Sequence, residues 1–137
     1  MKTLGIEIKG NVAVFCAIED DGAIADITGA MKKLELKDDE SSVEVNKFMD
    51  TIYSYFKDMQ FDKIGIVKRN KSVKAKFRVS PISFKLEGFI QIYPDTEICF
   101  VSPQSLRAFM KKNPLPFTPK FSYQTSSAEL AYYLLQN

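Results

Sequence analysis

The sequence predicts a mixed α/β fold in which one central sheet is covered by helices on both faces. Residues 4–8 alternate between apolar and other side chains and residues 12–18 are apolar, and the intervening Gly10-Asn11 turn is typical of a β-hairpin. From Val45 to Met59, apolar residues recur every three or four positions, as on one face of a helix. Strand-like and helix-like segments then alternate, which gives the order β-β-β-α-β-α-β-α-α with three antiparallel strands at the start.

A turn and a helix cap are predicted between the first hairpin and the long helix. After a second turn near Gly22, residues 23–36 are expected to supply the third strand, with a kink near Gly29. Ser41 and Glu44 then have the three-residue spacing of a capping box, which predicts that the long helix begins there.

The second half repeats a strand–helix alternation. Residues 64–67 form a short apolar run that we expect to be a buried strand, parallel to the first strand because a helix connects the two. Residues 68–80 are polar and basic, as in a loop that leads into a helix. The remaining expected elements are a helix around 84–93, a strand over 97–101, a helix from Ser102-Pro103 to Lys112 and a last helix over about 125–135.

Composition limits the chemistry. With 137 residues, 45% of them hydrophobic and 26% charged, the chain fits a single domain over residues 1–137. It contains no histidine, which excludes Ser-His-Asp and Cys-His catalysis and histidine zinc ligands. Cys16 and Cys99 lie in apolar strand segments without CxxC spacing, so we interpret both as small buried residues.

No apolar run reaches the roughly 18 residues of a membrane span. We therefore expect no membrane association, and a reducing, cytoplasmic location.

The predicted order of elements is that of the ribonuclease H-like fold. Residues 4–11 place an acid in the first strand before a glycine turn and resemble the first hairpin of RuvC-like members of this fold. Residues 88–92, 98–101, Ser102-Pro103 and 106–112 resemble the later helix, strand, proline and basic helix of the Holliday-junction resolvases.

At the family level the resemblance covers nearly the whole chain. Gly5–Asn11, Phe84-Lys85 and Lys112–Pro116 resemble the signatures of a small gammaproteobacterial family of unknown function. That family implies no activity by itself, so the fold resemblance supplies the functional expectation.

The fold resemblance implies an acidic site. Active members hold two Mg²⁺ ions with three or four carboxylates from the first strand, the end of the fourth strand and the last helix. Glu7 matches the first acid, and Glu129 is the one acid in the last helix where the resolvases carry two. Val67 or Lys68 stands where the second acid is expected, and a lysine cannot coordinate a metal.

Glu7 and Glu129 are therefore the candidate catalytic and metal-binding residues, either as remnants or as a weak Mg²⁺ or Mn²⁺ site. Two side chains supply too few ligands for a working two-metal centre, so we expect weak or absent catalysis. A structural interpretation of Glu7 stays open. Its carboxylate can pair with Lys9 or Lys68, or lie at a solvated strand end.

The net charge of +2 conceals an asymmetry. Residues 1–62 carry 13 acidic and 7 basic side chains, whereas residues 63–137 carry 12 basic and 4 acidic ones. Between Asp62 and Glu87 there are only basic charges, and Phe77 among them offers a stacking face for a base. The candidate nucleic-acid-binding residues of this run are Lys68, Arg69, Lys71, Lys74, Lys76, Arg78 and Lys85.

The basic run also admits a structural interpretation, as a surface loop that balances the acidic half or docks on Asp38-Asp39-Glu40 of its own or a neighbouring chain. Three functional hypotheses follow. The first is a catalytically weak or inactive RuvC-like protein that binds DNA or RNA through residues 68–85. The second is a protein-interaction module or homodimer without a nucleic-acid role, and the third is an active Mg²⁺-dependent nuclease.

Overall fold

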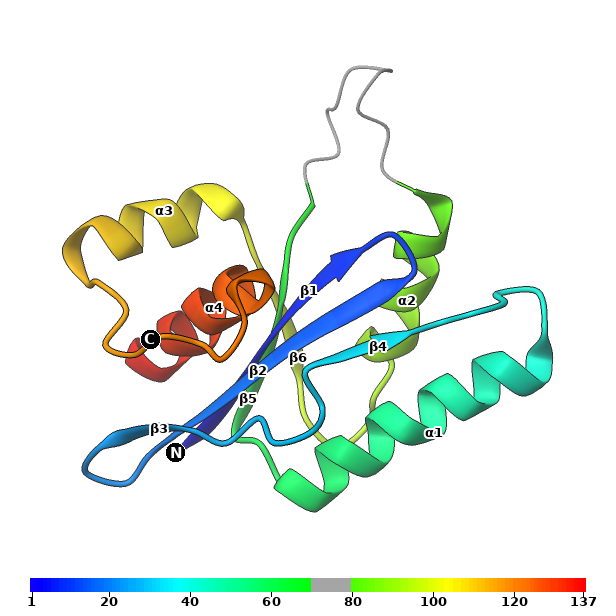
Figure 1. Cartoon of the computed structure of the whole chain (residues 1–137), viewed down its shortest axis with the longest axis horizontal. Coiled ribbons are helices and arrows are strands. Elements are labelled where there is room, and N and C mark those ends of the chain that lie inside the picture. The colour runs from blue at the N-terminus through cyan, green and yellow to red at the C-terminus, as the bar shows by residue number, and fades with distance from the viewer. Residues whose placement is uncertain (70–79) are drawn as a thin grey trace.

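A computed structural model describes residues 1–69 and 80–137, and these residues form one sheet of six strands with helices on both sides (Figure 1). The strand order is β3-β2-β1-β5-β6, and β4 also pairs with β2. The strands are β1 (Lys2–Lys9), β2 (Val12–Asp20), β3 (Ile24–Asp26), β4 (Lys33–Glu35), β5 (Lys63–Val67) and β6 (Ile98–Val101). The helices are α1 (Ser42–Met59), α2 (Pro81–Gln91), α3 (Pro103–Lys112), the 3₁₀ turn η2 (Ser122–Gln124) and α4 (Thr125–Gln136).

Strand β1 is central, and its pairing agrees with the predicted order. It runs antiparallel to β2, with Glu7 opposite Val14, and parallel to β5, with Ile6 opposite Ile66. The expected third strand is in fact two short strands, β3 and β4, which both pair with β2. Gly29 lies between them with a φ of 67°, a left-handed conformation that glycine adopts without strain and that interrupts a strand.

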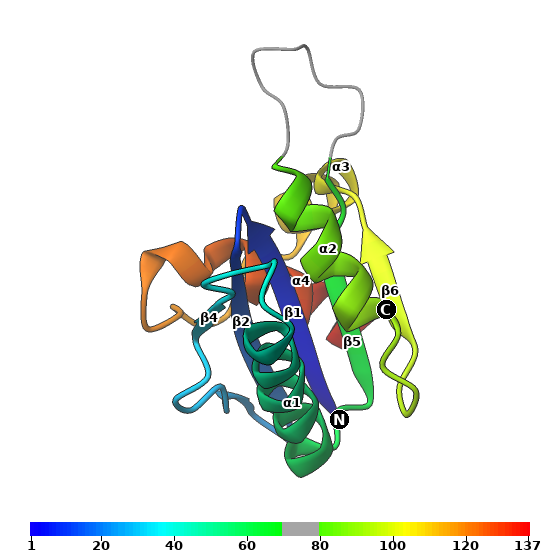
Figure 2. The same ribbon diagram turned by 90° about the vertical axis from the view of Figure 1, so that its right-hand side faces the viewer.

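The two faces of the sheet carry different helices. Leu4, Ile6 and Ile8 point to the face that packs against α1 and α2, where they form the larger core. Helix α4 covers the opposite face and α3 lies outside it, as the two views show (Figures 1 and 2). Helices on both faces were predicted, and the structure confirms them.

Helix ends follow the local signals. The Ser41 hydroxyl accepts a hydrogen bond from the Glu44 backbone N–H at 3.2 Å, so α1 begins where the capping box predicts. Pro103 opens α3, and the Ser102 hydroxyl accepts a hydrogen bond from the Ser105 N–H at 3.1 Å. Across residues 1–69 and 80–137, none of the helices has the length and apolar character needed to cross a membrane.

Helix α4 lies unusually close to β1 because Gly5 has no side chain. A Cβ atom at Gly5 would lie 2.0 Å from the backbone oxygen of Ser127. Two buried hydroxyls fix this contact: Thr3 Oγ1 donates to the Ala131 carbonyl at 2.7 Å, and Ser127 Oγ donates to the Val14 carbonyl at 2.8 Å. The position of α4 over the sheet is therefore set by backbone contact as well as by apolar packing.

Candidate functional site

Glu7 lies near the carboxyl end of β1, on the face covered by α4. Its side chain is 20% exposed, and its Oε1 atom is buried without a hydrogen-bond partner among the described residues. The Lys9 ammonium lies 3.5 Å from that oxygen, but the Lys9 side chain is 59% exposed. The pairing with Lys9 that the sequence left open is thus present as a loose ion pair, which leaves the carboxylate able to accept another ligand.

Glu129 lies on α4, the helix that covers the Glu7 face of the sheet. Burial raises the pKa of the Glu129 carboxyl, and the negative charge of Glu7 raises that pKa further. Like charges that share a partly buried site favour protonation of one of them or the binding of a cation. The two carboxylates that were predicted to form the site thus lie on the same side of the sheet, close enough for the charge of Glu7 to act on Glu129.

An apolar residue occupies the position at the end of β5 where the resemblance implies a further acid. Gly65 faces α4, because a Cβ atom there would contact Leu130 and Leu134, and Val67 lies two residues further along the same face of β5. The Val67 side chain packs with the cluster of Val101, Leu106, Leu130 and Leu134. Of the two residues considered for the position of the second acid, Val67 is the one on the face of Glu7.

Lys68 lies just after β5, and its backbone N–H donates to the Val101 carbonyl at 2.8 Å. Alternation along the strand turns its exposed side chain to the other face of the sheet. A bridge from Lys68 to Glu7 is therefore absent from the ion pairs of the described residues.

The donor set does not fit a two-metal centre. Within residues 1–69 and 80–137, no group of three or more Asp, Glu, His or Cys side chains is placed to hold a metal ion. Glu7 and Glu129 offer two carboxylates, whereas Mg²⁺ and Mn²⁺ prefer about six oxygen ligands and two-metal sites share several acids.

The seven basic residues predicted to bind nucleic acid fall into three groups: four outside the described residues, the exposed Lys68, and two that form ion pairs within the chain. Lys71, Lys74, Lys76 and Arg78, together with Phe77, lie outside the described residues. Lys68 is exposed.

Arg69 and Lys85 are both engaged within the chain. Arg69 donates to Glu87 Oε2 at 2.6 Å, and its guanidinium lies 3.8 Å from the centre of the Phe84 ring. Lys85 lies 3.1 Å from the Asp39 carboxylate, so this lysine docks on the acidic cluster of its own chain, as the structural interpretation proposed.

Two features of the site were not predicted. The close contact of α4 with Gly5 could have been predicted from the sequence, because a glycine inside a central strand often marks the close approach of another backbone. The Arg69–Glu87 pair had none, because it depends on how α2 lies against the end of β5.

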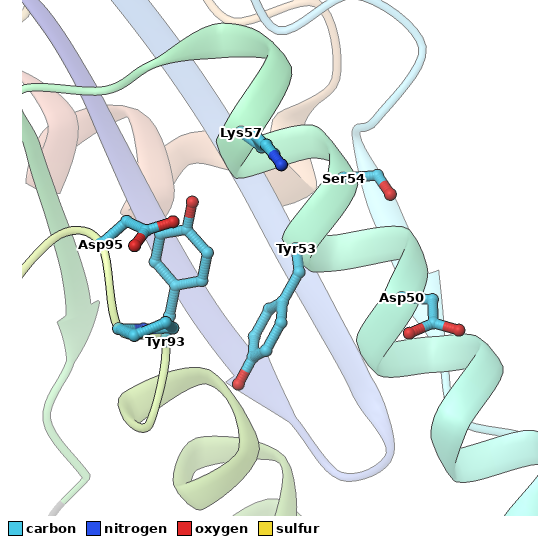
Figure 3. Close-up of a pocket in the computed structure, with 7 residues that line it drawn as sticks. Asp50, Tyr53, Ser54, Lys57, Tyr93 and Asp95 are labelled. Atoms are coloured by element: carbon cyan, nitrogen blue, oxygen red, sulfur yellow. The ribbon is translucent and has the colours of Figure 1, made fainter.

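A pocket of different character lies on the face covered by α1. Asp50, Tyr53, Ser54 and Lys57 of α1 line it, together with Tyr93, Pro94 and Asp95 from the connection after α2 (Figure 3). The centres of the Tyr53 and Tyr93 rings lie 5.0 Å apart. Burial raises the pKa of the Tyr93 hydroxyl, and the negative charge of Asp95 raises it further. This pocket contains neither Glu7 nor Glu129, so it is separate from the acidic pair.

Comparisons with known proteins identify a family and a fold. The sequence matches, over residues 1–134, a family described as protein of unknown function (DUF3010). No curated protein matches the chain.

Solved structures define the fold. Thermus thermophilus RuvC in complex with a Holliday junction substrate superposes with a TM-score of 0.75 at 9% identity, covering 100% of this chain and 97% of that one. A second Thermus thermophilus RuvC structure gives 0.67 at 9% identity, covering 99% and 96% of the two chains. Fowlpox virus resolvase with Holliday junction DNA gives 0.54 at 11% identity, covering 98% and 93%. These likenesses confirm the predicted ribonuclease H-like, RuvC-like fold.

Proposed function

The chain belongs to the DUF3010 family of proteins of unknown function, and from its own geometry we propose that it binds nucleic acid on a RuvC-like scaffold without efficient nuclease activity. The observation that carries this proposal is the acidic pair of Glu7 and Glu129 with Val67 beside it. The scaffold retains the place of a nuclease site, but the residues there supply too few metal ligands.

The acidic pair supports at most one weakly bound Mg²⁺ or Mn²⁺ ion. Glu7 Oε1 accepts no hydrogen bond from the described residues and has only a loose ion pair with Lys9. Together with the raised pKa of Glu129, this supports negative charge that a cation would stabilise. A single ion on two carboxylates lacks the partner that would stabilise both the attacking and the leaving oxygen of a phosphodiester. Catalysis is therefore weak or absent in this proposal.

Nucleic-acid binding is supported by fold and charge together. Two of the similar structures hold Holliday junction DNA, and the basic half of this chain begins at the strand that lies beside Glu7. Lys68 is exposed at the end of that strand, and the chain continues into Lys71, Lys74, Lys76 and Arg78. Basic side chains that neutralise phosphates give affinity that falls steeply with salt.

The test measures binding and cleavage on the same substrates. A fluorescent four-way DNA junction and a duplex of equal length are titrated with protein at low and at high salt. The junction is then incubated with Mg²⁺ or Mn²⁺. We expect salt-sensitive binding and no metal-dependent cleavage above background. Changing Lys68, Lys74 and Lys76 together to Glu should weaken binding at least about tenfold.

A control carries a single charge reversal on the α1 face, to be compared with Lys68→Glu alone. Lys57→Glu reverses an exposed lysine remote from the acidic pair and should leave binding within about twofold. Absence of binding by the parent protein at low salt would refute the proposal. If sedimentation then showed a salt-sensitive dimer, the protein-interaction alternative would replace it. Metal-dependent cleavage that is lost in Glu7→Gln would establish the active nuclease instead.

A further inference from the structure

Two aromatic side chains stack on the surface just before α4. The Phe121 and Tyr123 rings are nearly parallel, with an angle of 8° and 5.3 Å between their centres. Phe121 is 42% exposed, whereas Tyr123 is half-buried. An exposed ring on a stacked pair offers one more flat surface, on which a further planar group can stack.

Two lysines lie against this ring pair, and a third lies nearby. Lys120 Nζ lies over the Phe121 ring at 5.8 Å from its centre, and Lys33 Nζ lies over the Tyr123 ring at 5.1 Å from its centre. A planar group that stacks on Phe121 must therefore displace the flexible Lys120 side chain. Lys32 and Lys120 also line a shallow pocket with Asp26, Thr28 and Gly29.

The carboxylate of Asp26, the acidic residue of this pocket, already accepts hydrogen bonds from its own chain. Asp26 Oδ1 accepts hydrogen bonds from the Thr28 backbone N–H at 2.9 Å and from the Thr28 hydroxyl at 2.6 Å. Lys32 donates to the Gly29 carbonyl. Glu35 lies two residues from Lys33 on the same face of β4, so three lysines stand against two carboxylates. The balance beside the rings is still positive.

The ring pair is held by the core. Gln124 is fully buried, and its Nε2 atom donates to the Phe15 carbonyl of β2 at 2.8 Å. The Oε1 atom of the same side chain accepts from the Phe121 backbone N–H at 3.1 Å. The stacking surface is thus attached to the central sheet through one buried side chain and is preformed for a ligand.

Strand pairing places Lys33, next to the ring pair, on the same face of the sheet as Glu7. Val14 of β2 is opposite Glu7 on one side and opposite Lys33 on the other. Because neighbouring strands are about 4.8 Å apart, the Cα atoms of Lys33 and Glu7 lie about 10 Å apart across the sheet. Residues directly opposite each other point to the same face, so Lys33 and Glu7 share the α4 face.

We propose that Phe121, Tyr123 and the lysines 32, 33 and 120 form a second nucleic-acid site, which binds an unpaired nucleotide. The base stacks on Phe121, and the lysines bind the adjacent phosphates. Bases inside a duplex are covered on both faces, so the site selects single-stranded segments. The proposal rests on the proposed nucleic-acid binding but uses a surface separate from residues 68–85.

Charge and shape favour this occupant. A planar aromatic face next to clustered cations is the combination that binds single strands without sequence preference. An acidic peptide would use the lysines but would not need the exposed Phe121 ring. Removal of the ring alone therefore separates the two ligands.

The test compares a paired and an unpaired substrate. Fluorescence anisotropy measures binding of a short oligothymidylate, of a fully paired four-way junction and of the same junction with a three-nucleotide gap. Phe121→Ala should weaken binding of the oligothymidylate and of the gapped junction about tenfold. It should leave the paired junction within about twofold. Phe121→Tyr keeps a ring and should restore binding.

Two controls keep the result interpretable. Ile92→Ala removes a 70%-exposed apolar side chain beyond the end of α2 and should change none of the affinities. Thermal unfolding of Phe121→Ala checks that the fold is intact. A 2-aminopurine base in the gap should lose fluorescence on binding the parent protein but not Phe121→Ala.

The outcomes separate this inference from the proposed function. If the parent binds the paired junction and Phe121→Ala binds single strands equally well, only the stacking site is wrong. If single-strand binding instead depends on Lys33 and Lys120 alone, the surface is a general polyanion site and the inference also fails. If the parent binds no nucleic acid, the proposed function and this inference both fail.

Discussion

Gly5 of β1 and Ser127 of α4 meet backbone to backbone, and a Cβ atom at Gly5 would lie 2.0 Å from the Ser127 carbonyl oxygen. This contact places the first two turns of α4 over the central strand of the sheet. Glu129 lies within these turns, and the charge of Glu7 acts on it. The same helix carries Ser127 to its hydrogen bond with Val14.

Gly5→Ala should destabilise the protein by about 3 kcal/mol, because α4 must move away from β1 to admit a methyl group. The matched control is Gly88→Ala in α2, where an added Cβ meets nothing within 4 Å. That change should raise stability by about 0.5–1 kcal/mol through helix propensity. Urea unfolding of both variants checks the difference, and equal stabilities would contradict the close contact.

Glu129→Gln should stabilise the protein near neutral pH. Burial and the Glu7 charge raise the pKa of Glu129 in the folded state, so its ionised form is disfavoured there. The corresponding loss of stability appears as pH rises through the folded pKa, and it is absent below the unfolded value of about 4.3. The variant should therefore melt higher than the parent at pH 7–8 and at the same temperature at pH 3.5.

The pH profile of Glu7→Gln provides the control for this explanation. Removing the Glu7 charge eliminates the second cause of the shift, so the pKa of Glu129 should fall while burial keeps it above its ordinary value. Nuclear magnetic resonance titration of the Glu129 carboxyl measures this directly. An unchanged pKa in Glu7→Gln would show that the two carboxylates do not interact.

Val67→Asp should create a third carboxylate beside the pair. We expect its affinity for Mn²⁺ to exceed that of the parent by about tenfold or more, because affinity for hard cations rises with the number of charged oxygen ligands. Val67→Asn has nearly the same size and tests whether charge is the cause. Isothermal titration with Mn²⁺ measures both variants. If Val67→Asn matched Val67→Asp, loosened packing would explain any gain.

The two ion pairs of the basic run should differ in strength. The Arg69 and Glu87 side chains are 11% and 16% exposed, whereas those of Lys85 and Asp39 are 41% and 30% exposed. Glu87→Gln should cost about 2 kcal/mol, because it leaves a largely buried guanidinium without its counter-charge. Asp39→Asn should cost less than about 1 kcal/mol. Urea unfolding at low and high salt compares them, and similar costs would show that burial does not control these pairs.

The sequence by itself determined the order of elements, except that the expected third strand is the two strands β3 and β4. It also determined where α1 and α3 begin, whereas α2 begins at Pro81, three residues before the first apolar residue of the expected helix. Apolar spacing of three to four residues in α1 and alternation in β1 arise from the geometry of each element, so they are visible without any neighbour. The cap at Ser41 is equally local. The resemblance around Glu7 and the single acid of the last helix predicted the two members of the acidic pair.

Only the tertiary structure decided how these parts meet. Strand alternation over Val67 and Lys68 makes one of them face Glu7, and which one depends on the register between β1 and β5. The pairing of Arg69 with Glu87 depends on the placement of α2 beside that strand. Lys33 reaches Tyr123 only because β4 pairs with the outer side of β2. Contacts between residues far apart in the chain arise from packing, which no local pattern encodes.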